Sequence, residues 1–191
     1  MTKRRAIFLD RDGVLNAALV RQGKPHPPEN LAEVRVLPDV TEACDLLRAA
    51  GFVLIMVTNQ PDVVRRIQSR EMVEAINAEI CEAVQLDDTR ICYHDDVDNC
   101  GCRKPKPGLL TDAAHAWNID LRQSFMVGDR YKDIDAGTRV GCTTILVDHH
   151  YDEEFPTHPD ARVASLKEAA QWILDHMHME DEFEVDCGTK S

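Results

Sequence analysis

Long apolar runs and an excess of positive charge are both missing from this 191-residue chain. No stretch approaches the roughly 20 consecutive apolar residues that a membrane-spanning helix requires. Acidic residues outnumber basic ones by 34 to 22, and the net charge of −12 opposes general binding to nucleic acid or anionic lipid. We therefore expect the chain to bind neither a membrane nor nucleic acid. A small anionic substrate in a local basic pocket remains compatible with this charge.

Complete disulfide pairing and a secretory leader are not indicated either. The seven cysteines are an odd number, so they cannot all pair with one another. The N-terminus, MTKRRAIFLDRDGV, has an apolar part that is too short for a signal peptide and runs directly into charged residues. We expect a cytoplasmic protein, in which clustered cysteines bind metal or stay reduced. A single domain and a monomer are expected.

Apolar runs do alternate with segments of helical periodicity along most of the chain. Strands are predicted at RRAIFLD, FVLIMVTNQ, RICYH, SFMVGD, TTILVD and ARVAS, and helices at 39–50, 70–86, 108–119, 132–140 and 166–178. This alternation is typical of an α/β protein with a three-layer, Rossmann-like parallel sheet. The proline-rich segment 17–38 is expected to be a surface loop. Residues 1–179 are predicted to form the domain, and the acidic residues 180–191 a disordered tail.

Acidic side chains follow two of the apolar runs, at the strand ends where open parallel sheets bind ligands. Asp10 and Asp12 end the first strand and project from one side of an extended chain. Asp129 ends the fourth strand. Carboxylates that meet in this way repel each other unless a cation lies among them, and oxygen ligands of this kind suit Mg²⁺. Asp129 is expected to bind the metal directly, and Asp133 through water.

Polar and basic side chains complete the predicted cluster. Thr58 and Asn59 follow the second strand and can donate hydrogen bonds to phosphate oxygens. A lysine is needed to balance the carboxylates, and Lys104 and Lys106 in CRKPKPG are both candidates. Arg103 can hold a phosphate or a sugar hydroxyl with its planar guanidinium group. Together these residues predict a site for a small phosphorylated molecule.

The stretch CYHDDVDNCGCRKPKPG contains three of the seven cysteines together with a histidine. Cys92, His94, Cys100 and Cys102 supply a Cys₃His ligand set, which is common in structural zinc sites. Four protein ligands would complete the tetrahedron and leave no position for water. We therefore predict a zinc-binding loop over residues 92–102. Zinc would fix the shape of this polar segment and present Arg103 to the substrate.

The motifs DRDGVLN, VTNQ, CRKPKPG and VGDRYKD occur in this order within residues 5–150. In combination they resemble the haloacid dehalogenase-like (HAD-like) phosphatase superfamily. The greatest similarity is to the branch that contains heptose bisphosphate phosphatases and histidinol-phosphate phosphatases, which have a similar zinc loop. The resemblance implies a HAD-like fold. No large cap domain is expected, because no segment between the predicted strands is long enough to form one.

For the reaction, the resemblance implies that Asp10 is the nucleophile and forms an aspartyl-phosphate intermediate. Asp12 would be the general acid for the leaving alcohol and then the base that activates water. Thr58 and Lys104 would hold the transferring phosphoryl group. Mg²⁺ would be bound by Asp10, by the backbone carbonyl oxygen of Asp12 and by Asp129. The residues expected to contact the rest of the substrate are Asn59, Arg103 and Arg130.

The implied enzyme is a Mg²⁺-dependent phosphomonoesterase that acts on a small sugar phosphate. Carbon 7 of a heptose 1,7-bisphosphate is the expected site of cleavage, and histidinol phosphate or another small sugar phosphate is the alternative. The segments PDVVRRIQS and AALVRQGKPHPPENL depart from the pattern of the heptose phosphatases and border the substrate, so the identity of the sugar stays open. Arg21, Arg65 and Arg66 in these segments are candidates for contact with a second phosphate.

Two other classes of protein fit the sequence less well. A zinc-stabilised binding module without catalysis is disfavoured because Asp10, Asp12, Thr58, Lys104 and Asp129 are all present. An enzyme that processes nucleic-acid ends is disfavoured by the acidic charge and by the lack of an aromatic and basic stripe. Arg11, which alternates with the two aspartates, is expected to be a solvated or packing residue.

Overall fold

The computed structural model describes residues 2–152 and 158–187. Six parallel strands form one sheet in the order β5-β4-β1-β6-β7-β8. The strands are β1 Ala6–Leu9, β4 Val53–Asn59, β5 Asp88–Cys92, β6 Phe125–Gly128, β7 Thr143–Val147 and β8 Ala161–Val163. The helices are α1 Val40–Ala49, α2 Arg70–Val84, α3 Gly108–Trp117, α4 Tyr131–Val140 and α5 Leu166–Cys187. Every strand and helix predicted from the sequence is present.

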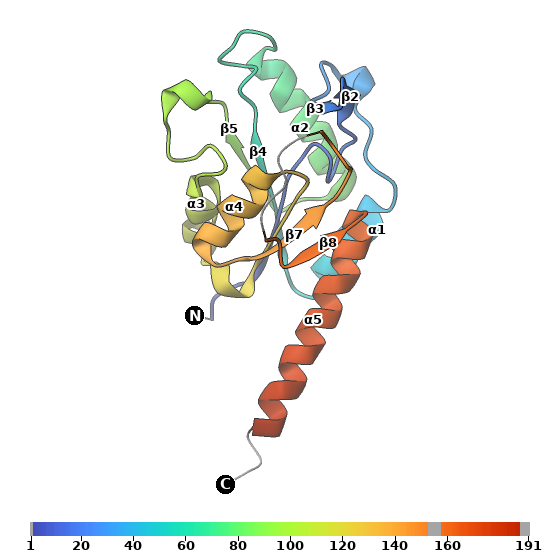
Figure 1. Ribbon diagram of the computed structural model, residues 1–191, viewed down its shortest axis with the longest axis vertical. Helices are drawn as coiled ribbons and strands as arrows, with labels where there is room; N and C mark the ends of the chain where they lie inside the picture. The colour runs from blue at the N-terminus through green and yellow to red at the C-terminus, as the bar shows by residue number, and fades with distance from the viewer. Residues whose placement is uncertain (1, 153–157, 188–191) are drawn as a thin grey trace.

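Helices cover both faces of the sheet and so make three layers (Figure 1). In β1, Ile7 and Leu9 belong to the hydrophobic cluster that includes α1, α2 and α5. Ala6 and Phe8 belong to the cluster on the other face, with α3 and α4. A strand that is buried on both faces needs an apolar residue at every position, which explains the continuous apolar runs. The predicted three-layer α/β architecture is confirmed.

The register of the strands brings the motif-bearing segments together. β1 lies in the centre of the sheet, where Leu9 is opposite Met56 of β4 and Val127 of β6. The carboxyl ends of these three neighbouring strands therefore lie at the same edge. Residues 10–13, the end of β4 with residues 60–61, and residues 129–130 therefore lie side by side at that edge.

The segment 17–38 is not the irregular loop that its proline content predicted. It contains an antiparallel hairpin, β2 Leu19–Arg21 and β3 Lys24–His26, followed by the 3₁₀ turn η1 Leu31–Glu33. Gln22 and Gly23 join the strands with φ angles of 52° and 75°, as a tight two-residue hairpin turn requires. Figure 1 shows the hairpin at the upper end of the molecule, together with the loops after β4 and β5. As predicted, the described part of the chain contains no large cap domain.

The last helix is longer than the sequence predicted. It begins at Leu166 as expected, but it continues to Cys187 instead of ending at residue 178. Leu166, Ala169 and Ile173 pack against the sheet, while the later turns extend away from the body of the molecule (Figure 1). Residues 180–187 of the predicted tail therefore belong to this helix. Residues 188–191 lie outside the described residues.

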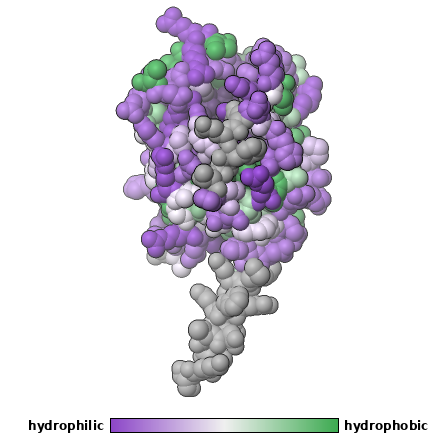
Figure 2. Space-filling view, in the orientation of Figure 1, coloured by the Kyte–Doolittle hydropathy of each residue, from purple (hydrophilic) through white to green (hydrophobic). Residues whose placement is uncertain are grey.

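The surface is mostly hydrophilic on the side seen in Figure 2. Within the described ranges, no helix is both long enough and apolar enough to cross a membrane. The described cysteines form no disulfide and are Cys44, Cys81, Cys92, Cys100, Cys102 and Cys142. Cys92 ends β5, and Cys100 and Cys102 lie in the loop that follows it, where all three are available as ligands.

Candidate active site

A cavity of about 410 Å³ lies at the carboxyl ends of the central strands. A volume in this range suits a small-molecule ligand. The eight residues that the sequence predicted as catalytic, substrate-binding or Mg²⁺-binding all line it: Asp10, Asp12, Thr58, Asn59, Arg103, Lys104, Asp129 and Arg130. The topology thus brings together four motifs that are spread over 120 positions, because residue 10 and residue 130 follow adjacent strands.

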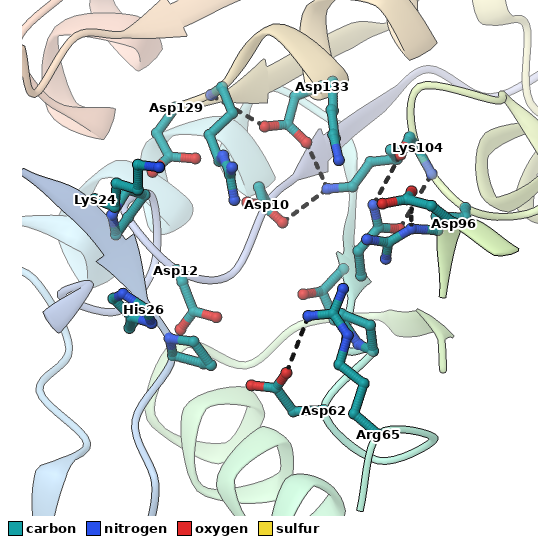
Figure 3. Close-up of a pocket in the computed structure, with 18 residues that line it drawn as sticks. Asp10, Asp12, Lys24, His26, Asp62, Arg65, Asp96, Lys104, Asp129 and Asp133 are labelled. Atoms are coloured by element: carbon teal, nitrogen blue, oxygen red, sulfur yellow. Dashed lines mark hydrogen bonds and ion pairs between the residues drawn. The ribbon is translucent and has the colours of Figure 1, made fainter. Parts of the chain in front are cut away.

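Lys104 lies among the carboxylates of the cavity and is 2% exposed. Its Nζ atom donates to Asp10 Oδ1 at 2.7 Å and contacts Asp133 Oδ1 at 2.5 Å (Figure 3). The same atom donates to the Val57 carbonyl oxygen at 2.7 Å. Burial acts to lower the pKa of Lys104, but the two carboxylates outweigh it and raise that pKa above its ordinary value. Lys106 contacts the Asn99 carbonyl oxygen instead. Lys104 is therefore the lysine that balances the carboxylates.

Asp129 provides the strongest indication of a metal site. Both of its carboxylate oxygens are buried and form no hydrogen bond of normal geometry with the described residues. The Tyr151 hydroxyl lies close to this carboxylate, and burial followed by the charge of Asp129 raises the pKa of Tyr151. Oxygens of Asp10, Asp129 and Asp133 lie within 4.8 Å of one another. Burial, followed by the charges of Asp10 and Asp133, raises the pKa of Asp129 well above its usual range. A carboxylate without a hydrogen-bond partner beside two other carboxylates fits a divalent cation such as Mg²⁺, which would keep Asp129 ionised.

The same forces act on Asp10. Burial and the charge of Asp133 raise its pKa, although Lys104 opposes both effects. One lysine thus compensates only part of the negative charge of three carboxylates. A cation beside Asp129 would supply the remainder.

Two glycines allow the carboxylates to approach so closely. Gly13 has a φ angle of 86°, and a Cβ atom on it would lie 2.0 Å from Asp129 Oδ2. A Cβ atom on Gly128 would lie 2.1 Å from the Cβ atom of Asp133. A side chain at either position would displace one of the clustered carboxylates. The glycines of the DRDG and VGD motifs are therefore part of how this sequence builds the site.

Asp12 is oriented by Arg11, whose side chain is fully buried. Arg11 Nη2 donates to Asp12 Oδ2 at 2.7 Å, and Arg11 Nη1 donates to Asn77 Oδ1 of α2 at 2.9 Å. Gln60 Nε2 and Asn16 Nδ2 each approach the Asp12 carboxylate at 3.3 Å. Arg11 therefore packs inside the protein, which was one of the two roles expected for it. Through Asn77, it connects the Asp12 carboxylate to α2.

The two polar residues at the end of β4 make different contacts. Thr58 is buried, and its hydroxyl accepts a hydrogen bond from Gln60 Nε2 at 3.0 Å. Asn59 Nδ2 donates to the Lys104 carbonyl oxygen at 2.9 Å, and its Oδ1 accepts from the Lys104 backbone N–H at 3.1 Å. Both polar atoms of the Asn59 side chain are thus engaged with the backbone of Lys104. In this structure Asn59 positions the lysine as well as lining the cavity.

The four predicted zinc ligands converge at the end of β5 and in the loop that follows it. Cys102 Sγ lies 3.2 Å from Cys92 Sγ, 3.4 Å from Cys100 Sγ and 3.4 Å from His94 Nδ1. Sulfurs that share a tetrahedral zinc at a Zn–S distance of about 2.3 Å lie about 3.8 Å apart. The donor set and its compact arrangement therefore fit a structural zinc ion, with Nδ1 as the histidine ligand atom.

The zinc loop also holds two arginines that line the cavity. Arg103 Nε donates to Asp96 Oδ1 at 2.7 Å, and its Nη1 donates to the His94 carbonyl oxygen at 3.2 Å. Arg65 donates to both carboxylate oxygens of Asp95 at 2.7 Å. The hydrogen bonds from Arg65 and from the Asp96 backbone hold the pKa of Asp95 at about 2. These roles of Asp95 and Asp96 were not predicted, because acidic residues in a polar loop give no signal of their own.

Other residues that line the cavity were also missed by sequence reasoning. Four of them follow one another in the hairpin segment: Lys24, Pro25, His26 and Pro27. The Gln22-Gly23 pair is a hairpin-turn signal that could have located them, but the neighbouring prolines favoured a loop. Of the three arginines considered for a second phosphate, only Arg65 lines the cavity. Arg21 contacts Glu29 at 2.6 Å instead.

The fold and the cavity define a phosphatase of the HAD-like class, and comparison with known proteins agrees. A family model described as HAD-hydrolase-like matches residues 101–169. The chain is 36% identical over 155 residues to the D-glycero-beta-D-manno-heptose-1,7-bisphosphate 7-phosphatase of Yersinia pestis, covering 74% of this chain and 79% of that protein. Its identity to the enzyme of the same name from Helicobacter pylori J99 is 30% over 179 residues, covering 91% and 99%.

Solved structures show the same relationship. The D,D-heptose 1,7-bisphosphate phosphatase of B. bronchiseptica, crystallised with magnesium and phosphate, superposes with a TM-score of 0.78 at 27% identity, over 90% of this chain and 99% of that one. The corresponding enzyme of Burkholderia thailandensis shares the fold, with a TM-score of 0.63 at 20% identity and coverage of 90% and 99%. The chain belongs to the haloacid dehalogenase-like phosphatases, which are phosphoric monoester hydrolases. The family resemblance noted in the sequence is confirmed.

Proposed function

We propose that this chain is a Mg²⁺-dependent phosphatase that removes the 7-phosphate of D-glycero-D-manno-heptose 1,7-bisphosphate. The observation that carries this proposal is the contact of Lys104 with Asp10 beside the unpartnered oxygens of Asp129. It provides a carboxylate nucleophile, a cation for the phosphoryl group and a place for a metal in one cavity. The names of the relatives from Yersinia pestis and Helicobacter pylori support the choice of substrate.

Asp10, the backbone carbonyl oxygen of Asp12, and Asp129 would hold the Mg²⁺ ion. When bound, the ion neutralises phosphate charge that would otherwise keep a carboxylate away from phosphorus. Asp133 contacts Lys104, and its Oδ2 accepts from the Arg130 backbone N–H at 3.2 Å. Because both oxygens of Asp133 have protein partners, its contact with the metal would be through water.

Four side chains have separate roles in the two steps of the reaction. The oxygen of Asp10 that does not face Lys104 forms a bond to phosphorus, and the bond from phosphorus to the sugar oxygen breaks. Asp12 gives its proton to that leaving oxygen. Asp12 next takes a proton from water, whose oxygen attacks phosphorus and frees inorganic phosphate from Asp10. Lys104 and Thr58 hold the phosphoryl oxygens in both steps.

We further propose that the loop 92–102 binds a structural zinc ion. Cys92, His94, Cys100 and Cys102 would occupy all four coordination positions, so this ion would not contact the substrate. The ion would affect the site only indirectly, by fixing the loop whose residues accept hydrogen bonds from Arg103. A reducing compartment such as the cytoplasm would keep the three thiols available for zinc.

A panel of phosphorylated substrates, scored by phosphate release, tests the proposed function. We expect the highest kcat/KM for heptose 1,7-bisphosphate, with release that depends on added Mg²⁺ after the protein has been desalted. A strong preference for histidinol phosphate would overturn the proposed substrate but not the assignment as a phosphatase. Full activity without any added divalent ion would contradict the metal assignment.

A further inference from the structure

The β2–β3 hairpin places two basic side chains over the cavity, in a segment outside the four motifs. Lys24 and His26 are separated by one residue in β3, so they project from the same face of the strand. Both line the cavity. Figure 3 shows them on one side of it, across from Lys104 and Asp96. The hairpin therefore adds a basic wall that faces the reacting groups.

Lys24 differs from other cations of the cavity in its partners. Lys104, Arg65 and Arg103 each contact at least one carboxylate at 2.7 Å. Among the side chains of residues 2–152 and 158–177, Lys24 has no ion-pair partner, and its own side chain is exposed. Its charge is thus available to a ligand, whereas the charges of those three residues are largely balanced by the protein itself.

The hairpin is fixed over the cavity without the use of these two side chains. At its turn, the Asp152 backbone N–H donates to the Gly23 carbonyl oxygen at 3.0 Å. At its base, Gln68 Nε2 donates to the carbonyl oxygens of Pro28 and Glu29 at 3.0 and 2.9 Å. β3 is therefore held in place from both ends, and a ligand need not order the hairpin when it binds.

We propose that Lys24 and His26 bind the phosphate group of the substrate that is not cleaved. This rests on the proposed function, in which the cleaved phosphate lies at Asp10 and a second phosphate lies at the other end of the sugar. A phosphate dianion forms strong charge-assisted hydrogen bonds with a lysine, and the imidazole of His26 can donate another. The hairpin thereby determines the preference of the enzyme for a bisphosphate over a monophosphate.

Two substrates that differ by one phosphate provide the test. The measured quantity is kcat/KM for heptose 1,7-bisphosphate divided by kcat/KM for heptose 7-phosphate, which lacks only the uncleaved group. We expect K24M to lower this ratio about ten-fold, mainly through a higher KM for the bisphosphate, because a charge-assisted hydrogen bond is lost. K24R should retain most of the preference, since it keeps the positive charge.

R21M is the matched control, because Arg21 lies in the same hairpin but contacts Glu29 and does not line the cavity. Its ratio should equal that of the unmodified protein. An unchanged ratio in K24M, or an equal fall in R21M, overturns the subsite while the phosphatase assignment stands. If the unmodified protein hydrolyses neither heptose, the proposed function fails and the subsite fails with it. The two failures are therefore distinguishable by whether turnover occurs.

Discussion

The floor of the cavity, formed by Asp10, Lys104, Asp129 and Asp133, is built differently from its rim, formed by residues 24–27, Arg65 and Asp96. The floor is buried, Lys104 contacts Asp10 and Asp133 directly, and the Asp129 carboxylate lies close beside them. Buried charges are costly without partners, so any change there disturbs several groups at once. The rim is more exposed, comes from three separate segments of the chain, and holds ion pairs that contribute little to stability. The floor is thus suited to the chemistry of the family, and the rim to the choice of substrate.

The largest effect is expected from Asp10→Asn in the floor. An amide oxygen is a poor nucleophile, so kcat should fall by at least about a thousand-fold. Asp135→Asn is the matched control, because Asp135 lies in α4 but does not line the cavity. Phosphate release measured with saturating substrate separates the two variants. Activity above a few per cent in Asp10→Asn would remove the nucleophile assignment.

A pair of glycines tests how closely the floor is packed. Gly13 and Gly51 both have a φ angle of 86°, but a Cβ atom would collide with Asp129 at Gly13 and would meet nothing within 4 Å at Gly51. Substitution by alanine should therefore cost about 1–2 kcal/mol of backbone strain at both positions. Only Gly13→Ala should also lose about a hundred-fold in kcat/KM, because it displaces the Asp129 carboxylate. Equal kinetics in the two variants would mean that the position of Asp129 is not critical.

Removal of a zinc ligand should destabilise the zinc loop, which contacts Arg103 and Arg65. The effect on the reaction should be smaller than that of Gly13→Ala. We expect Cys102→Ser to lose bound zinc and to lower Tm by about 10 °C, because metal binding contributes directly to folding. Cys142→Ser is the control, since Cys142 is also a buried free cysteine but is not one of the four clustered ligands, and this variant should keep the full zinc content. Zinc analysis and thermal unfolding of both variants provide the measurement. A Cys102→Ser protein with normal zinc content would contradict the ligand set.

The same contrast between floor and rim explains how much the sequence could predict. The strands were predictable because burial on both faces leaves continuous apolar runs. The floor was predictable because clustered carboxylates require a cation, which pointed to a metal and a lysine. The hairpin was missed because its prolines indicated a loop, although Pro25 pairs with Val20 in an exposed two-stranded ribbon. Contacts such as that of Asp95 with Arg65 join segments 30 residues apart and leave no local pattern.

The smallest effect is expected from Asp95→Asn in the rim. Asn keeps the acceptor for the Asp96 backbone N–H but loses the charge that holds Arg65. Because the pair is partly exposed, we expect KM for the bisphosphate to rise less than about five-fold with kcat unchanged. The pKa of Asp95 is lowered to about 2, so the carboxylate is ionised above that pH and loses the pair only as the pH falls toward it. The KM of the Asp95→Asn variant divided by the KM of the unmodified protein should therefore stay constant from pH 6 to 9. A ratio that varies over this range would show that another group controls Arg65.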